Sequence, residues 1–341
     1  MTTRRPVTIH DVAREAGVSK STVSRILDER RPVSSSATAE RVREAAQRLG
    51  YRRDASASAL RRQQTGTIGV LVPRLSDAVM AMFFEEVARA CRDAARFAIV
   101  ATTGDEPRTE AIAAETLLAQ GVDGLVMTTA RADSDTTERL RRQGVPLVLA
   151  LRTDGATPAS LCDDELGGFL ATRHLLDLQH RRIGLVAGPD YASSALGRRA
   201  GHARALAEAG VELDPALVRA SSFGMESGAT EAGALLDTAD PPTAIFAIND
   251  NTAVGVLAAA QQRGLSVPDD LSVVGYNDIP LSARLPVPLT TVHVPLDQVA
   301  RSAVDMLRTL LDGRPVEEDR TALPTLIPRS STAAPASLRR R

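Results

Sequence analysis

The sequence predicts a multidomain protein in which an all-α head precedes a larger α/β core. The chain has 341 residues, which is more than one hydrophobic core usually supports. Apolar residues follow helical spacing up to Leu49, whereas from Thr67 onward apolar β-rich runs alternate with amphipathic helical stretches. We therefore expect a head over about 1–52, a linker over 53–65 and a core over 66–332.

The segment 7–27 predicts two short helices joined by a tight turn. Thr8 and Asp11 form a capping-box pattern at the start of the first helix. Gly17 ends that helix, because a residue without Cβ adopts a left-handed conformation at little cost. Ser19 can cap the second helix. The apolar residues expected to face inward are Ile9, Val12, Ala13, Ala16, Val18, Val23, Ile26 and Leu27.

The second helix presents a row of short polar side chains and cations to solvent or to a ligand: Lys20, Ser21, Thr22, Ser24 and Arg25. Such side chains suit base edges and phosphates, although an ordinary helical hairpin with a solvated face is the alternative. Residues 1–62 hold 14 Lys and Arg against 7 Asp and Glu, a charge of +7, so the rest of this −1 chain carries −8. This asymmetry favours a polyanionic partner for the head.

A third helix is expected from Thr38 to Leu49, ended by Gly50. In the linker that follows, Asp54 can cap a short helix with Ala57 and Leu60 on one face. A helix this short is marginal alone, because nucleation is costly. The linker is therefore either a plain flexible connection or a hinge helix that orders only against DNA or a second copy.

The core contains apolar runs that alternate with helices, which is typical of parallel sheets covered on both faces. Eight or nine strands over this length suggest two sheets rather than one. The runs are TIGVLVP (67–73), FAIVAT (97–102), GLVMT (124–128), PLVLAL (146–151), RIGLVAG (182–188), TAIFAI (243–248), LSVVGY (271–276) and TTVHV (290–294).

Ligands of open α/β sheets bind beyond the carboxyl ends of the strands. In this chain those positions hold Asn, Asp and Arg beside a phenylalanine, a combination that suits a sugar or a nucleoside. Asn249 and Asp250 precede a helix and can equally serve as its N-cap. The positions are Leu75 to Met80, Thr128, Arg152, the loop after Gly188, Phe223, Asn249–Asp250 and Asn277–Asp278.

Other classes of protein are not indicated. No dinucleotide-binding, P-loop, nucleophile-elbow or zinc-protease motif is present, so we expect neither an enzyme nor a bound cofactor. Five scattered histidines and two distant cysteines, Cys91 and Cys162, fit no metal spacing. The chain shows neither a signal peptide nor a membrane-length apolar run, so a reduced cytoplasmic protein without membrane contact is expected. The tail 333–341 has the composition of a disordered segment.

The combination of these features resembles the lactose-repressor/galactose-repressor (LacI/GalR) family of bacterial transcription regulators, from about Val7 to Thr332. The head motif TIHDVAREAGVSKSTVSRIL is close to the family signature. The segments IGVLVPRLSD, GVDGLVM and TAIFAINDNTAVGVLAAAQQRGLSVPDDLSVVGYND follow in family order. The resemblance implies a homodimer whose helix-turn-helix reads half of a palindromic DNA operator in the major groove.

The resemblance also implies a core of two Rossmann-like subdomains, like a periplasmic sugar-binding protein, with an effector between them. The N-subdomain would span about 66–162 plus 293–322, and the C-subdomain about 163–292 plus 323–332. The implied DNA-binding residues are Thr8, Ile9, His10, Ser19, Lys20, Ser21, Thr22, Ser24, Arg25, Thr38 and, in a hinge helix in the minor groove, Ala57 and the wedge Leu60. The implied effector-binding residues are Leu75, Asp77, Val79, Met80, Thr128, Arg152, Arg198, Phe223, Asn249, Asn277 and Leu296.

Departures from the family pattern concern the effector site. Asp77 to Met80 replace an Asn-Pro pair and two aromatic residues, and Leu151 replaces an aspartate. His202 stands where an aromatic residue often follows the family arginine, here Arg198. The pocket is therefore less acidic and less aromatic than a typical hexose site. A neutral sugar is the first expectation, and a carboxylate or phosphate held by Arg198 and Arg152 is the alternative.

Two functions from different classes follow. The first is a transcriptional repressor whose DNA affinity is controlled by a small metabolite, acting either as inducer or as corepressor. The second is a solute-binding protein of the same core fold whose N-terminal helices only mediate assembly.

Overall fold

The computed structural model describes residues 7–27, 35–51 and 65–339. The chain forms two compact units, Met1–Gly66 and Thr67–Arg341, which we describe separately as the head and the core. The expected hinge helix, with Ala57 and Leu60, lies outside the described residues. No helix in the described ranges is long and apolar enough to cross a membrane.

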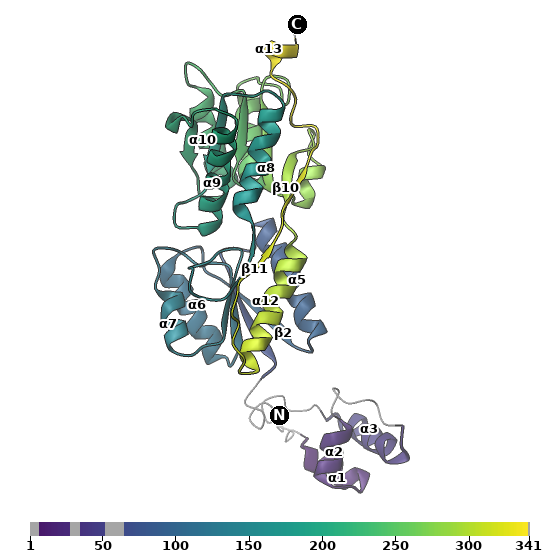
Figure 1. Cartoon of the computed structure of the whole chain (residues 1–341). Helices are drawn as coiled ribbons and strands as arrows, with labels where there is room; N and C mark the ends of the chain where they lie inside the picture. The colour runs from purple at the N-terminus through teal and green to yellow at the C-terminus, as the bar shows by residue number, and fades with distance from the viewer. Residues whose placement is uncertain (1–6, 28–34, 52–64, 340–341) are drawn as a thin grey trace, which may run out of the picture. The chain divides into compact units, whose positions relative to one another are not determined.

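The head contains three described helices, α1 (Ile9–Ala16), α2 (Lys20–Ile26) and α3 (Ala37–Leu49) (Figure 1). The predicted caps are confirmed. The Thr8 backbone N–H and hydroxyl both donate to the Asp11 carboxylate, at 2.9 and 2.7 Å. Gly17 ends α1 with a φ of 66°, and the Ser19 hydroxyl accepts a hydrogen bond from the Thr22 N–H. The head core joins all three helices through buried Val12, Ala13, Ala16, Val23, Val42, Ala45 and Ala46.

The core contains two six-stranded sheets, which confirms the prediction of two sheets. The first has the order β11-β5-β4-β3-β1-β2, and all its neighbouring strands are parallel. Its strands are β1 (Thr67–Val72), β2 (Phe97–Thr102), β3 (Gly124–Met127), β4 (Leu147–Ala150), β5 (Ala159–Cys162) and β11 (Arg320–Ala322).

The second sheet has the order β12-β10-β9-β8-β6-β7, in which only the β12–β10 pair is antiparallel. Its strands are β6 (Ile183–Ala187), β7 (Val218–Ala220), β8 (Ala244–Ala247), β9 (Ser272–Asn277), β10 (Thr290–His293) and β12 (Thr325–Ile327). The expected number of eight or nine strands was too low, since the described residues form twelve. The four that were missed, β5, β7, β11 and β12, have only three or four residues each and lack a clear apolar run.

Alternation of side chains along the strands explains why helices cover both faces of each sheet. In the first sheet Val70, Val126 and Val148 contact α5 (Ala78–Asp93) and α12 (Leu296–Leu311). Leu71 and Leu125, one residue away on β1 and β3, contact the opposite layer of α6 (Pro107–Ala119) and α7 (Thr136–Arg142). We call this sheet with its four helices the N-subdomain.

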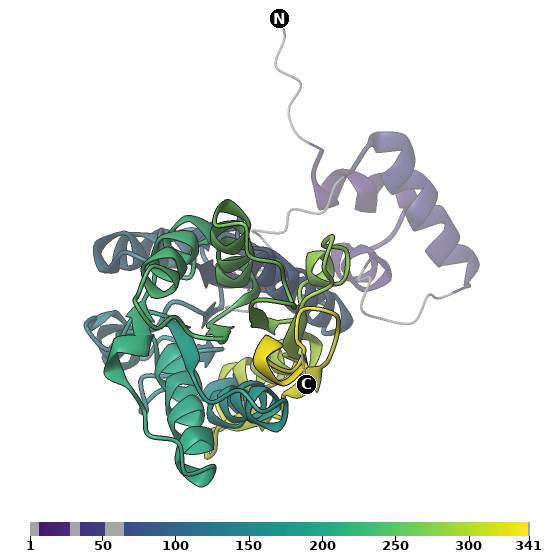
Figure 2. The ribbon, with the colours of Figure 1, turned by 90° about the horizontal axis from the view of Figure 1, so that it is seen from above.

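The second sheet is covered in the same way by α8 (Asp164–Asp177) and α9 (Ser193–Glu208) on one face. Its other face packs against α10 (Met225–Leu236) and α11 (Asp250–Gln262). Seen from above, the teal α8 and α9 and the green α10 and α11 lie on opposite sides of the sheet (Figure 2). We call the second sheet with its four helices the C-subdomain. The chain passes between the two subdomains three times, before α8, before α12 and between β11 and β12.

The described residues at the end of the chain, up to 339, differ from the disordered tail that the sequence predicts. The Ala333 carbonyl accepts hydrogen bonds from Ser272 Oγ at 3.0 Å and from His180 Nε2 at 2.9 Å. Pro335 is buried, and α13 (Ala336–Arg339) follows. The small side chains that suggested disorder instead allow this segment to lie against the C-subdomain.

Candidate nucleic-acid interface and ligand pocket

The helix α2 presents the polar face that the sequence predicted. Lys20, Ser21 and Arg25 are exposed, and Thr22 and Ser24 are half-buried, whereas Val23 is fully buried against the head core. The Ser19 hydroxyl lies 2.9 Å from both Ser21 Oγ and Thr22 Oγ1, so these three hydroxyls form one cluster at the N-terminus of α2.

Two cations on this face are available to a ligand. Lys20 and Arg25 have no ion-pair partner within the described part of the head, whereas Arg14 and Arg48 pair with Asp11 at 3.8 Å and Glu15 at 3.2 Å. Lys20 is also the only lysine of the chain.

The remaining candidates lie around α2 and at the start of α3. Of the other residues implied to bind DNA, His10 is exposed, Thr8 and Thr38 are half-buried, and Ile9 packs against the head core. An apolar side chain such as Ile9 contributes to the shape of the face rather than to hydrogen bonding.

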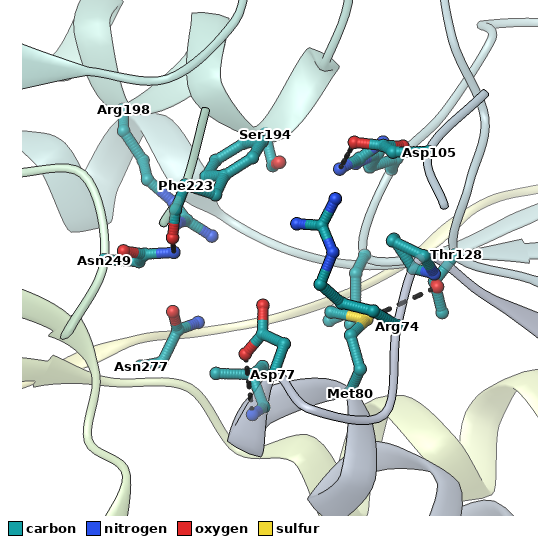
Figure 3. A pocket seen from close by; sticks show the side chains of 14 residues that line it. Arg74, Asp77, Met80, Asp105, Thr128, Ser194, Arg198, Phe223, Asn249 and Asn277 are labelled. Carbon is teal, nitrogen blue, oxygen red and sulfur yellow. Dashed lines mark hydrogen bonds and ion pairs between the residues drawn. The ribbon is translucent and has the colours of Figure 1, made fainter. Parts of the chain in front are cut away.

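A pocket lies between the two subdomains, at the carboxyl ends of strands from both sheets. Figure 3 shows Arg198, Asn249 and Asn277 of the C-subdomain facing Asp77 and Arg74 of the N-subdomain. The pocket is lined by Pro73, Arg74, Asp77, Val79, Met80, Asp105, Thr128, Leu151, Arg152, Ser194, Arg198, Phe223, Asn249 and Asn277.

Nine of the eleven residues implied to bind the effector line this pocket, and two do not. Leu75 is 41% exposed beside it, and Leu296 is buried in the first turn of α12. The implied set lacked Pro73, Arg74, Asp105, Leu151 and Ser194. Asp105 could have been found, because it follows the end of β2, where the same carboxyl-end rule applies.

The backbone is strained at three pocket residues. Leu151, Phe223 and Asn277 have φ values of 63°, 64° and 105°, in the left-handed region that favours glycine. Each such residue costs about 1–3 kcal/mol, and such strain gathers at ligand sites. The surrounding strands and helices therefore hold these side chains in positions that a relaxed loop would not adopt.

Arg152 reaches the pocket as part of a buried ion pair. Its guanidinium donates to both oxygens of Asp105, at 2.9 and 3.3 Å, and both side chains are about 8% exposed. Burial alone would raise the pKa of Asp105, but Arg152, Tyr191 and Arg131 outweigh it and hold that pKa below its usual value. Asp105 is therefore an ionised carboxylate, and Arg152 enters the pocket already neutralised.

Arg198 is held by the C-subdomain in a similar way. It donates to Asp164 Oδ1 and to the Ile248 carbonyl, both at 2.8 Å, and its guanidinium lies 3.7 Å from the centre of the Tyr276 ring. These contacts require close packing of α9 on α8. Gly168 on α8 allows that packing, because a Cβ there would lie 2.1 Å from the Arg198 carbonyl oxygen.

Two further pocket residues cap helices that begin at the pocket. Asp77 Oδ1 accepts from the Val79 N–H at 3.1 Å and, across the subdomains, from the Asn251 amide at 3.2 Å. Burial raises the pKa of Asp77, against the effect of these hydrogen bonds and of Arg74. Asn249 Oδ1 caps α11 by accepting from the Thr252 N–H at 2.7 Å, so the N-cap interpretation and the pocket position both hold for this residue.

The side chains of Asn277 and Ser194 differ from these partnered groups. Neither has a hydrogen-bond partner among the described residues, although both line the pocket. The pocket thus combines two neutralised guanidinium groups, those of Arg152 and Arg198, with the exposed Arg74, one aromatic ring, a free amide and a free hydroxyl. Such a set can bind a small ligand that offers several hydroxyl groups and an apolar face.

Comparisons with known proteins agree with this architecture. Residues 8–54 match the model for bacterial regulatory proteins of the lacI family, and residues 172–332 match a periplasmic binding protein-like domain. The chain is 35% identical over 330 residues to the ribose operon repressor of Haemophilus influenzae, covering 95% of this chain and 98% of that protein. It is 32% identical over 325 residues to catabolite control protein A of Priestia megaterium, covering 93% and 96%.

Solved structures show the same likeness over nearly the whole chain. The lac repressor dimer bound to operator and the anti-inducer ONPF aligns with a TM-score of 0.84 at 29% identity, covering 97% of this chain and all of that chain. A complex of the transcriptional regulator CelR with cellobiose aligns with a TM-score of 0.74 at 30% identity, covering 96% of this chain and all of that one. Fold and site together define a DNA-binding transcriptional regulator with a ligand-binding core. The chain belongs to the lacI family of bacterial regulatory proteins.

Proposed function

We propose that this protein is a homodimeric repressor whose affinity for a palindromic operator is controlled by a small polyhydroxylated metabolite bound between its subdomains. The observation that carries the proposal is a pocket lined from both subdomains in a chain whose α2 also presents cations without an ion-pair partner among the described residues. A ligand in such a pocket favours one relative orientation of the subdomains, which is a known route to switching. The alternative, a solute-binding protein, leaves the exposed Lys20 and Arg25 without a role.

The charges of the pocket favour a neutral ligand over an anion. Arg152 is paired with Asp105 and Arg198 with Asp164, so both guanidinium groups already have a carboxylate. The third pocket arginine, Arg74, interacts electrostatically with the Asp77 carboxylate of the same pocket. A phosphate or carboxylate would have to compete with these buried ion pairs. A sugar or polyol can instead accept from the remaining N–H groups and bond to Asn277 and Ser194. The relatives named as a ribose operon repressor and as a cellobiose complex support the same class.

An exposed apolar edge supports assembly into a dimer. The strand β2 is an edge of the first sheet, and its side chains Phe97 and Ile99, two residues apart, are 66% and 39% exposed. Exposed apolar side chains on an edge strand favour association with another chain. Sedimentation equilibrium of the wild type should give a dimer, and Phe97→Glu should shift it toward monomer.

DNA binding is tested by fluorescence anisotropy with a palindromic duplex that the wild-type protein selects from a random library. We expect log affinity to fall linearly with log salt, with a slope of about −0.9 for each phosphate neutralised.

Lys20→Ala should weaken binding to this duplex by roughly 10- to 100-fold if the lysine contacts a base edge. Arg14→Ala is the matched control, because Arg14 is an exposed cation on α1 outside the α2 face. Absence of binding to any duplex at low salt would refute the repressor and favour the solute-binding protein.

The ligand class is tested by thermal unfolding with a panel of neutral sugars, polyols, sugar acids and sugar phosphates. A ligand that binds the folded chain raises its melting temperature by mass action. We expect binders among the neutral sugars and polyols, with binding lost in Asn277→Leu. Stabilisation only by sugar acids or phosphates would contradict the neutral class. The effect of the binder on duplex affinity then decides between inducer and corepressor.

A further inference from the structure

Tyr191 connects the two subdomains beside the pocket without lining it. It lies in the loop between β6 and α9 of the C-subdomain, and its hydroxyl donates to Asp105 Oδ2 of the N-subdomain at 2.8 Å. The Tyr191 carbonyl accepts from the Ala132 N–H at 3.0 Å, and the Arg131 guanidinium lies 3.4 Å from the centre of the Tyr191 ring. One residue of the C-subdomain is thus held by three groups of the N-subdomain.

We propose that Tyr191 is a positioning residue that clasps the two subdomains and connects the state of the pocket to their closure through Asp105 and Arg152. This inference rests on the proposed function of the pocket as the effector site. It assigns to Tyr191 and Arg131, neither of which lines the pocket, a part in the response to ligand.

The coupling runs through a carboxylate that two groups share. Asp105 Oδ2 accepts both from Tyr191 at 2.8 Å and from Arg152 at 3.3 Å, while Oδ1 accepts from Arg152 at 2.9 Å. Burial and the neighbouring Asp105 carboxylate raise the pKa of Tyr191, so its hydroxyl keeps the proton that it donates. A ligand hydroxyl that accepts a hydrogen bond from Arg152 competes with Asp105 for the guanidinium N–H groups. The strength with which Asp105 accepts from Tyr191 changes as a result. The hydrogen bond across the subdomains then strengthens or weakens with occupancy of the pocket.

Two backbone amides report on this closure directly. The Ala132 N–H donates to the Tyr191 carbonyl, and the Thr153 N–H donates to Ser193 Oγ at 2.9 Å, each from the N-subdomain to the C-subdomain. Both bonds break when the subdomains separate at this edge, and their exchange with solvent measures how often that happens.

Hydrogen exchange of the full-length protein, read by mass spectrometry without DNA or ligand, tests the clasp. Tyr191→Phe keeps the ring over Arg131 but removes the hydroxyl. We expect the amides of Ala132 and Thr153 to exchange about tenfold faster or more, because a hydrogen bond to a charged group is lost. Amides in β1 should not change. Unchanged exchange at Ala132 and Thr153 would overturn the clasp and leave the proposed function standing.

A matched control separates the clasp from general destabilisation. Asp123 forms a similarly buried ion pair with Arg96 at 2.8 Å inside the N-subdomain, at the end of β3 opposite to Ala132. Asp105→Asn should accelerate exchange at Thr153 locally, whereas Asp123→Asn should not raise it above other amides of the N-subdomain. Equal effects of the two variants at Thr153 would reduce Asp105 to a structural role and refute the clasp.

The connection to function is tested with the selected palindromic duplex. If closure at Tyr191 biases the state that binds DNA, Tyr191→Phe changes duplex affinity by about fivefold or more, the lower range of allosteric couplings. Its melting temperature should stay near that of the wild type. A faster exchange at Ala132 with unchanged duplex affinity would overturn the coupling. Loss of duplex binding in the wild type itself would instead refute the proposed function.

Discussion

The two candidate sites of this protein differ in how their polar groups are satisfied. On the α2 face of the head, Lys20 and Arg25 are exposed, and neither has an ion-pair partner among the described residues. In the pocket, Arg152 and Arg198 are buried, and each is bonded to a carboxylate. A face that neutralises a polyanion gains by leaving its cations open, since the ligand supplies the counter-charge. A pocket for a small neutral ligand gains by fixing its groups in advance, because less freedom is then lost on binding.

The largest expected effect is the loss of a pocket cation. Arg198→Met leaves Asp164 buried without its partner, and we expect the core to lose about 3–5 kcal/mol of unfolding free energy. Burial raises the pKa of Asp164, so the carboxyl can take up a proton once Arg198 is gone. The loss should therefore be smaller at pH 5 than at pH 8. Urea unfolding followed by circular dichroism measures both values.

The control for this prediction is an ion pair on the surface of the same subdomain. Arg173 and Asp177 are one turn apart on α8, and about half of each side chain is exposed. Arg173→Met should change the unfolding free energy by only about 0.5 kcal/mol. Losses of similar size in the two variants would mean that the pocket ion pair is no better fixed than a surface pair, and the contrast between the two sites would fail.

The second prediction concerns His202, one helical turn after Arg198. Its ring is buried, its Nδ1 lies 2.9 Å from Thr172 Oγ1, and burial lowers its pKa to about 4. A histidine in the unfolded chain has a pKa of about 6.5, so the unfolded state binds the proton first as pH falls. The core should therefore lose roughly 3 kcal/mol between pH 6.5 and pH 4 through this residue.

The comparison of wild type with His202→Asn isolates that loss. Asp250 acts in the opposite direction, because burial raises its pKa to about 6 and its contribution falls as pH rises from about 4 to about 6. It is present in both proteins and cancels in their difference. The difference in unfolding free energy should grow from pH 4 to pH 6.5 and then level off. The described head has no buried ionisable side chain, so exchange of α3 amides should not follow this pH profile. A difference independent of pH would contradict the prediction.

The same contrast explains how much of each site could be predicted from sequence. The caps of α1 and α2 and the inward Val12 and Val23 follow from spacing over a few residues, because helical caps and faces are local. The position of the pocket followed from a rule about strand ends, and it located Arg152 and Phe223.

The partners inside the pocket could not be predicted, because they are set by contacts between distant segments. Asp105 and Arg152 are 47 residues apart, and Tyr191 is 86 residues from Asp105. Nothing in the local pattern around any of them indicates that they meet. Strands such as β5 and β11 were missed for a related reason, since pairing with a neighbour rather than an apolar run makes them strands.

The smallest expected effect tests whether the head is stabilised locally. Ser19→Ala removes the hydroxyl that accepts from the Thr22 N–H at 3.2 Å, and a lost N-cap costs about 1 kcal/mol. Amides of α2 should exchange roughly fivefold faster, since the four first N–H groups of a helix depend on such caps. Ser21→Ala is the control, because Ser21 Oγ contacts the Ser19 hydroxyl at 2.9 Å but caps no backbone group. Amides of α8 and α9 should be unaffected in both variants, because the head and the core are separate units. If Ser19→Ala also accelerates exchange in α8, the two units unfold together, and the head could not be treated as a locally determined element beside a core fixed by long-range contacts.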